Sequence, residues 1–75
     1  MTSLADLTLG ARARVTKVLG VDDISIRLME MGLTPGVELK LMGAAPLGDP
    51  LELELRGYRL SIRRSEAARV EIETA

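Results

Sequence analysis

The sequence lacks several of the side chains on which protein chemistry most often depends. Its 75 residues include no Cys and no His, which excludes disulfides, thiolate nucleophiles and imidazole bases or ligands. Phe and Trp are also absent, and Tyr58 is the single aromatic residue, so there is little to stack against single-stranded nucleic acid. We therefore expect no enzyme, with no catalytic residues, no cofactor and no metal site.

An excess of charge is missing as well. Ten Lys and Arg stand against eleven Asp and Glu, for a formal net charge of -1, so nothing draws the chain generally toward nucleic acid or anionic lipid. The chain has neither a signal-like start nor an apolar run of membrane-spanning length. We expect a cytoplasmic protein without direct membrane insertion, and residues 1–75 as a single domain.

What the sequence does contain is strand-like alternation. Apolar and polar residues alternate in four segments, which are residues 37–41, 51–56, 58–63 and 69–73. Residues 11–18 alternate too, but the phase slips after Val15, as a β-bulge would make it do. Five strands of this kind predict a mainly β fold, a small and strongly bent antiparallel barrel.

The register of one hairpin can be predicted from its turn. If Arg56 and Gly57 form a two-residue loop, Leu55 faces Tyr58, and the following apolar residues also face each other. This places Tyr58 on the inner face of the barrel. On the outer face the same register brings Glu54 opposite Arg59, an attractive pair.

Residues 22–32 change from strand to helix periodicity. Asp22 or Asp23 suits the helix N-cap, and Arg27 lies at the correct spacing to pair with Asp23 or Glu30 on the helix surface. We therefore predict one inserted α-helix at about residues 22–32.

Glycine and proline mark the turns between these elements. Residues 43–50, GAAPLGDP, predict a loop in which Asp49 makes a local bond to the backbone. Short capped turns are predicted at residues 3–6, with Asp6 as the cap, and at residues 65–68. The residues assigned to structural turns are Gly32, Pro35, Gly36, Asp49, Pro50 and Gly57.

The predicted helix is apolar on more of its surface than one packing contact needs. At about 100° per residue, its apolar side chains form two nearly opposite faces. These faces are Ile24, Leu28 and Met31 on one side, and Ile26, Met29 and Leu33 on the other. One face must pack on the barrel, and the periodicity does not say which. The other is covered by loops or faces another protein, and both interpretations remain open.

With these patterns in place, the chain resembles the FeoA family over nearly its whole length. The most specific segment is RLMEMGLTPG (residues 27–36), followed by APLGDP (45–50) and RGYRLSIRRSEA (56–67). Leu4, Leu7 and Gly10, and the segment from Val15 to Gly20, complete the resemblance. Order and spacing carry the match, because no single motif is decisive.

The resemblance implies an SH3-like barrel with an inserted helix. It also implies an accessory protein that acts by contact, binding the cytoplasmic part of FeoB, a membrane ferrous-iron transporter with a G domain, and supporting or regulating Fe(II) uptake. The helix and its exit then become the candidate partner-binding surface. Its residues are Arg27, Leu28, Met29, Met31 and Leu33.

Three alternatives remain beside this interpretation. A small RNA- or ribosome-associated barrel would bind through its hairpin arginines, although neighbouring glutamates oppose such binding and no nucleic-acid partner is expected. A detached SH3-like interaction domain of the kind found in metal-dependent repressors is the second. An iron-sensing or iron-carrying protein is the third, and without His or Cys it would bind iron only weakly, through carboxylates. An exposed apolar face could also make the protein a homo-oligomer.

Overall fold

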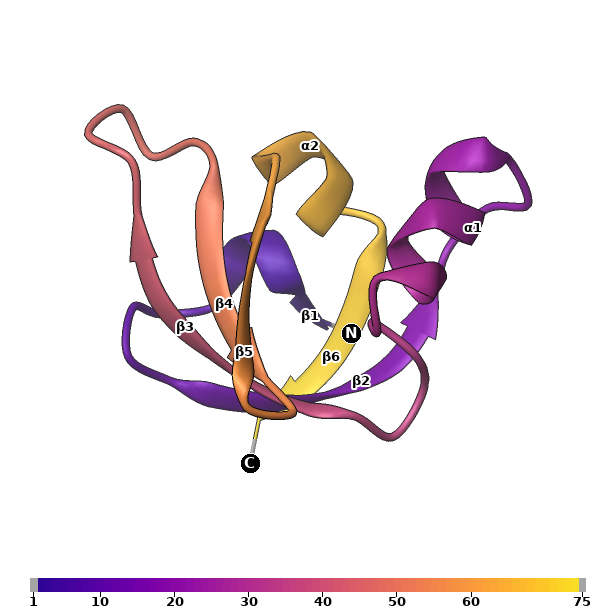
Figure 1. Ribbon diagram of the computed structural model, residues 1–75, viewed down its shortest axis with the longest axis horizontal. Coiled ribbons are helices and arrows are strands. Elements are labelled where there is room, and N and C mark those ends of the chain that lie inside the picture. The colour runs from indigo at the N-terminus through magenta and orange to yellow at the C-terminus, as the bar shows by residue number, and fades with distance from the viewer. Residues whose placement is uncertain (1, 75) are drawn as a thin grey trace.

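The computed structural model describes residues 2–74, in which six strands form one curved sheet (Figure 1). The strands are β1 (Thr2–Ser3), β2 (Arg12–Val18), β3 (Glu38–Ala44), β4 (Leu51–Leu55), β5 (Tyr58–Ile62) and β6 (Val70–Thr74). All neighbours are antiparallel, in the order β1-β6-β2-β3-β4-β5. The predicted mainly β architecture is confirmed. The predicted number of strands, five, is wrong because β1 is too short to show alternation.

Three short helices complete the fold of residues 2–74. They are the 3₁₀ helix η1 (Leu4–Asp6), α1 (Asp23–Glu30) and α2 (Arg64–Ala67). In Figure 1, α1 lies to one side of the barrel, and α2 lies across the end where β5 leads into β6. The helix predicted at residues 22–32 is confirmed with narrower bounds, because Asp22 is its N-cap and Met31 its C-cap.

The core is built from the inner faces of the strands, as the alternation predicted. Leu4 of η1 and Leu7, its C-cap, are both buried and belong to the core cluster. The fully or nearly fully buried strand residues are Ala13, Val15, Leu39, Leu41, Leu51, Leu53, Leu55, Ile62, Val70 and Ile72. A cluster of this kind stabilises the barrel mainly through the removal of apolar area from water.

A bulge and a tight turn give the sheet its curvature and register. The pairing of β2 with β6 shifts between Val15 and Lys17, so the predicted bulge is confirmed. The β4–β5 register is also confirmed, with Leu55 opposite Tyr58. Arg56 and Gly57 have φ of 49° and 82°, as a type I′ hairpin turn requires.

Tyr58 departs from its predicted place inside the barrel. Its side chain lies at the rim and is 42% exposed, although its register with Leu55 is as predicted. Glu54 and Arg59 are opposite each other in the register, but among residues 2–74 the ion pairs within 4.0 Å do not include this one. The hairpin therefore aligns these two charges without bringing them into contact.

Two predicted local bonds are replaced by other contacts. Asp6 does not cap the backbone, because its Oδ2 accepts a hydrogen bond of 3.1 Å from Ser3 Oγ. Asp49 does not bond its own turn, because its Oδ1 accepts from the backbone N–H of Arg64 at 2.9 Å. That bond ties the β3–β4 loop to the start of α2.

The turn after α1 has the predicted geometry. The N–H of Val37 donates to the carbonyl oxygen of Thr34 at 3.1 Å, and Gly36 between them has φ of 94°. Together with Pro35 in the preceding position, these features define a type II turn.

Candidate interaction surface

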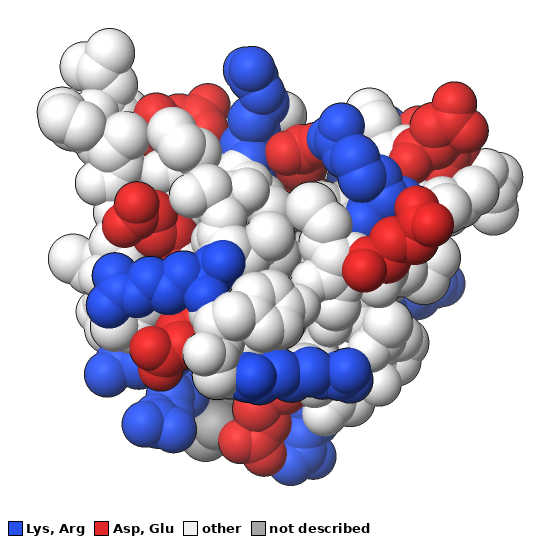
Figure 2. All heavy atoms as spheres, viewed as in Figure 1, with Lys and Arg blue, Asp and Glu red and all other residues white. Residues whose placement is uncertain are grey.

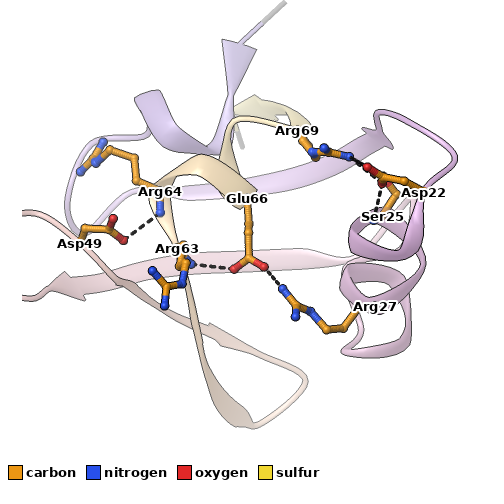
Figure 3. Close-up of polar contacts among 8 residues, drawn as sticks. All are labelled: Asp22, Ser25, Arg27, Asp49, Arg63, Arg64, Glu66 and Arg69. Carbon is orange, nitrogen blue, oxygen red and sulfur yellow. Dashed lines mark hydrogen bonds and ion pairs between the residues drawn. The ribbon is translucent and has the colours of Figure 1, made fainter.

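The start of α1 is fixed by a cluster of polar contacts. Asp22 Oδ1 accepts from the N–H of Ser25 at 3.2 Å, and Ser25 Oγ donates to the carbonyl oxygen of Leu19 at 2.5 Å. Arg69 Nη1 lies 2.6 and 2.8 Å from the two carboxylate oxygens of Asp22 (Figure 3). The Arg69 hydrogen bond is the main reason why the pKa of Asp22 lies below its ordinary value.

The middle of α1 is tied to α2 by a buried carboxylate. Glu66 is 9% exposed, and its Oε1 accepts from the N–H of Arg63 at 2.9 Å. The capped turn predicted at residues 65–68 is present with shifted bounds, because α2 begins at Arg64 and Arg63 is its N-cap. The Oε2 of Glu66 accepts from the guanidinium of Arg27, which reaches across from α1 (Figure 3). The surface pairs predicted for Arg27 with Asp23 or Glu30 are therefore wrong. The arginine instead neutralises a carboxylate that is costly to bury alone.

The end of α1 is held from β5. The hydroxyl of Tyr58 donates to the carbonyl oxygen of Met31, the C-cap residue. Gly32 follows with φ of 108°, and the N–H of Leu33 donates back to the carbonyl oxygen of Leu28 at 3.1 Å. This left-handed exit is the structural role predicted for Gly32.

These contacts settle which side of α1 packs on the barrel. Ser25 and Leu28 are fully buried, so the inner side of the helix lies between the two apolar faces found in the sequence. Both faces consequently remain partly in water, with Ile24 37%, Ile26 49% and Met29 39% exposed. Ile26 and Met29 are three residues apart and therefore neighbours on the helix surface. We call this pair the α1 apolar surface.

The predicted partner-binding residues divide into three groups. Leu28 and Leu33 are fully buried, so the prediction that they face a partner is wrong, because a buried leucine has no surface to offer. Arg27 is bound to Glu66. Met29 is exposed and Met31 is half-buried beside Tyr58. Of the five predicted residues, these two methionines are the ones that keep apolar surface in contact with solvent.

Sequence reasoning missed Ile26 as a surface residue. Its signal was present, since Ile26 and Met29 lie only about 60° apart on the helix. The loop before α1 adds Val21, which is 98% exposed and therefore does not pack against Ile26 as a hydrophobic staple would require. Apolar side chains thus continue from the α1 apolar surface toward that loop.

The rest of the described surface offers little chemistry. Within residues 2–74, no three acidic side chains gather where they could hold a metal ion. No helix in that range is both long and apolar enough to cross a membrane. Figure 2 shows positive and negative side chains interspersed over the visible face, without a field of one sign. The arrangement is suited to contact with another protein.

Comparison with known proteins agrees with this description. The model of the FeoA domain matches residues 2–74. The Fe(2+) transport protein A/Fe(2+) transporter FeoB fusion protein of Porphyromonas gingivalis is 34% identical over 70 residues, covering 93% of this chain and 8% of the fusion protein. This chain therefore spans only a small part of that relative.

Solved structures show the same fold. The solution structure of FeoA from Chlorobium tepidum is 40% identical with a TM-score of 0.89, over 97% of this chain and 70% of that one. FeoA from Stenotrophomonas maltophilia complexed with zinc, described as a procaryotic SH3 domain protein, is 32% identical with a TM-score of 0.84, over 97% and 91%. The barrel is thus SH3-like, and the chain belongs to the FeoA family, which is associated with ferrous-iron transport.

Proposed function

We propose that this chain is a non-catalytic interaction protein that binds the cytoplasmic part of a FeoB-type transporter and supports or regulates Fe(II) uptake. Contact is made through the α1 apolar surface, Ile26 and Met29, with Met31 and Val21 at its margins. The protein works in the cytoplasm and reaches the membrane through this partner. It needs no cofactor or nucleic acid for this role.

The observation that carries the proposal is the Porphyromonas gingivalis fusion protein, which combines transport protein A with the transporter FeoB in one polypeptide. Joining two domains in one chain raises their effective concentration to about the millimolar range for a short flexible linker. Such a linkage is useful when the two parts act together through a weak contact. A separate chain of the same family would make the corresponding contact between molecules.

The α1 apolar surface has properties that suit such a contact. Its helix is fixed at three points, by Arg69, Glu66 and Tyr58, so little conformational entropy is lost when a partner binds. Methionine adapts its shape to an apolar partner better than branched side chains do. The exposed area is small, which fits a regulated association.

The test compares two substitutions of exposed apolar residues. Tagged full chains carrying Met29→Glu or Leu47→Glu are mixed with a detergent-solubilised FeoB-type transporter from the same cells. Leu47 is 96% exposed at the tip of the β3–β4 loop, so it controls for the loss of an apolar side chain elsewhere. Circular dichroism and a thermal melt first establish that both variants are folded.

We expect Met29→Glu to weaken binding by roughly tenfold or more, as at a buried interface position, while Leu47→Glu binds like the unmodified chain. Equal binding by all three chains would refute this surface. If gel filtration shows instead that the unmodified chain is an oligomer and that Met29→Glu is a monomer, the α1 apolar surface joins copies of this chain. Each of the three chains is also returned to cells from which the native chain has been deleted. Fe(II) uptake should be restored by the unmodified chain and by Leu47→Glu, and less by Met29→Glu.

A further inference from the structure

One edge of the sheet has no partner strand among residues 2–74. The strand order begins with β1 and ends with β5, and β5 pairs only with β4. In a hairpin with a two-residue loop, the pair flanking the loop is hydrogen-bonded, and bonded and non-bonded pairs then alternate. Tyr58, Leu60 and Ile62 therefore bond to β4, whereas Arg59 and Ser61 direct their backbone groups outward.

Those outward groups have no acceptor or donor within the described chain. The backbone bonds found outside the regular helices and strands involve neither Arg59 nor Ser61, and both residues are exposed. Two N–H groups and two C=O groups at β-strand spacing are what another extended backbone pairs with. The edge contains no proline or bulge that would block such pairing.

Two arginines lie on the outer face of this edge, Arg59 within β5 and Arg63 directly after its end. Arg59, Ser61 and Arg63 follow one another at strand spacing, and in residues 2–74 no carboxylate lies within 4.0 Å of either guanidinium. Figure 3 shows the Arg63 guanidinium directed away from Glu66. Two nearby carboxylates are already bound, because Glu66 accepts from Arg27 and Asp49 accepts from the backbone N–H of Arg64. Glu54 and Glu52 of β4 lie opposite Arg59 and Ser61 in the register, but among residues 2–74 neither forms an ion pair with an arginine of this edge.

The inner face of the same edge is apolar and incompletely covered. Tyr58 is 42% exposed and Leu60 is half-buried. At the far end of the strand, Ser61, Ile62 and Arg63 border a pocket of ≈ 380 Å³, which Asp49, Pro50 and Glu66 complete. Side chains of an added strand would cover Tyr58 and Leu60 and reach this pocket beside Ile62, which is itself buried.

We infer that the β5 edge binds an extended segment of another polypeptide, added as a strand with the pattern acidic, apolar, any, apolar, acidic. The two acidic residues lie opposite Arg59 and Arg63, and the two apolar residues lie opposite Leu60 and Ile62. The pattern is symmetrical, so it fits in either strand direction. This inference goes beyond the proposed function, because it concerns a separate edge and does not require a transporter.

The charges argue against a second copy of β5 as the occupant. Antiparallel pairing of two β5 edges about Ser61 would place Arg59 of each copy opposite Arg63 of the other. Pairing about Arg59 would place the two copies of that arginine opposite each other. Like charges directly opposite each other are destabilising, so an acidic segment is the better match.

The test uses a synthetic peptide of glutamate, valine, threonine, valine and glutamate, blocked at both ends and flanked by glycines. It is titrated into the isotope-labelled full chain and followed by amide NMR. Binding should shift the amides of Arg59 and Ser61 and slow their hydrogen exchange. A matched peptide with lysine in place of both glutamates should bind at least roughly tenfold more weakly.

Two variants at one position separate backbone pairing from side-chain contact. Ser61→Pro removes an outward N–H without breaking a bond to β4, and edge strands tolerate proline at such positions. Ser61→Ala keeps the N–H. Once the hairpin register of each variant is confirmed by NMR, we expect Ser61→Pro to lose roughly tenfold in affinity and Ser61→Ala to bind normally.

Several results would overturn the inference. They are no binding of the peptide at millimolar concentration, equal binding by both Ser61 variants, or shifts confined to α1. Protection of the Arg59 and Ser61 amides that increases with protein concentration, without peptide, would assign the edge to a second copy of the chain. Failure of transporter binding through Met29 would leave this peptide result unaffected.

Discussion

The hydroxyl of Tyr58 donates a hydrogen bond to the carbonyl oxygen of Met31, so the single aromatic residue of the chain holds the end of α1. The Tyr58 side chain also lies directly over Gly32, where a Cβ would collide with its hydroxyl. Glycine is therefore required at position 32 for two reasons, its positive φ and the closeness of Tyr58. The two causes can be separated by experiment.

Gly32→Ala should destabilise the fold more than Gly36→Ala. Both glycines have positive φ, 108° and 94°, which costs an L-residue about 1–2 kcal/mol. Nothing lies within 4 Å of a Cβ at Gly36, so only Gly32→Ala also meets the Tyr58 hydroxyl. Urea unfolding should show a smaller loss for Gly32→Ala when Tyr58→Phe is already present. If Gly32→Ala costs the same free energy of unfolding with and without Tyr58→Phe, the collision with the Tyr58 hydroxyl is refuted.

Arg27→Met should destabilise the fold by about 1–3 kcal/mol, because the buried carboxylate of Glu66 loses its charged partner. In a Glu66→Gln background the same substitution should cost less than about 0.5 kcal/mol. Arg59→Met, at an exposed arginine, is the matched control and should change little. Additive losses from Arg27→Met and Glu66→Gln in chemical unfolding would show that the two side chains are not coupled.

Stability should depend on the charge of Asp22 above about pH 4. The pKa of Asp22 is lowered in the folded protein from its ordinary 3.8, so folding favours the charged form. The contribution is therefore present above the unfolded pKa and is lost as the pH falls through the folded one. Asp22→Asn keeps a good N-cap but removes the charge.

The thermal midpoints of the two chains measure this effect. The unmodified chain should melt at a higher temperature than Asp22→Asn at neutral pH, and the difference should vanish in acid. Because Asp22 is exposed, added salt should also reduce the difference. A difference that stays constant from neutral pH to acid would assign the effect of the substitution to something other than charge.

Arg56→Asn should stabilise the hairpin. Arg56 has a positive φ of 49° although it is not a glycine. Asparagine adopts that conformation at lower cost than arginine, and Asn-Gly is the sequence preferred in type I′ turns. We expect a gain of about 0.5–1 kcal/mol in the free energy of unfolding. Arg56→Val should have the opposite effect, since a β-branched residue is strained there. Equal stability of both variants would contradict the turn type.

The sequence was sufficient where local rules determine the structure. Alternation fixed the inner faces of the strands, and the Arg56-Gly57 loop fixed the β4–β5 register, because a slip of one residue would turn every leucine outward. The pair Asp22 and Asp23 and the glycine at position 32 marked the ends of α1 for similarly local reasons, a capping side chain and a positive φ, although the structure was needed to choose Asp22 as the cap.

The candidate surface could not be predicted in the same way, because it depends on distant contacts. Arg27 has two acidic neighbours on its own helix, but such exposed pairs are worth only about 0.2–0.5 kcal/mol. Glu66 lies 39 residues away in the sequence, and its buried carboxylate is stabilised much more by the positive charge of Arg27 than an exposed carboxylate would be. Likewise Ser25, a small polar residue, faces inward because its hydroxyl finds the Leu19 carbonyl.

The contacts that hold α1 have a consequence for the order in which the molecule is made. Its polar partners lie 27, 39 and 47 residues from their contacts on α1, and all of them come later in the chain. An isolated eight-residue helix is unstable in water. During translation, α1 therefore cannot be fixed in place until these later residues have been synthesised. Its apolar side chains stay exposed until then. Only a chain synthesised past Arg69 contains every polar partner that fixes α1.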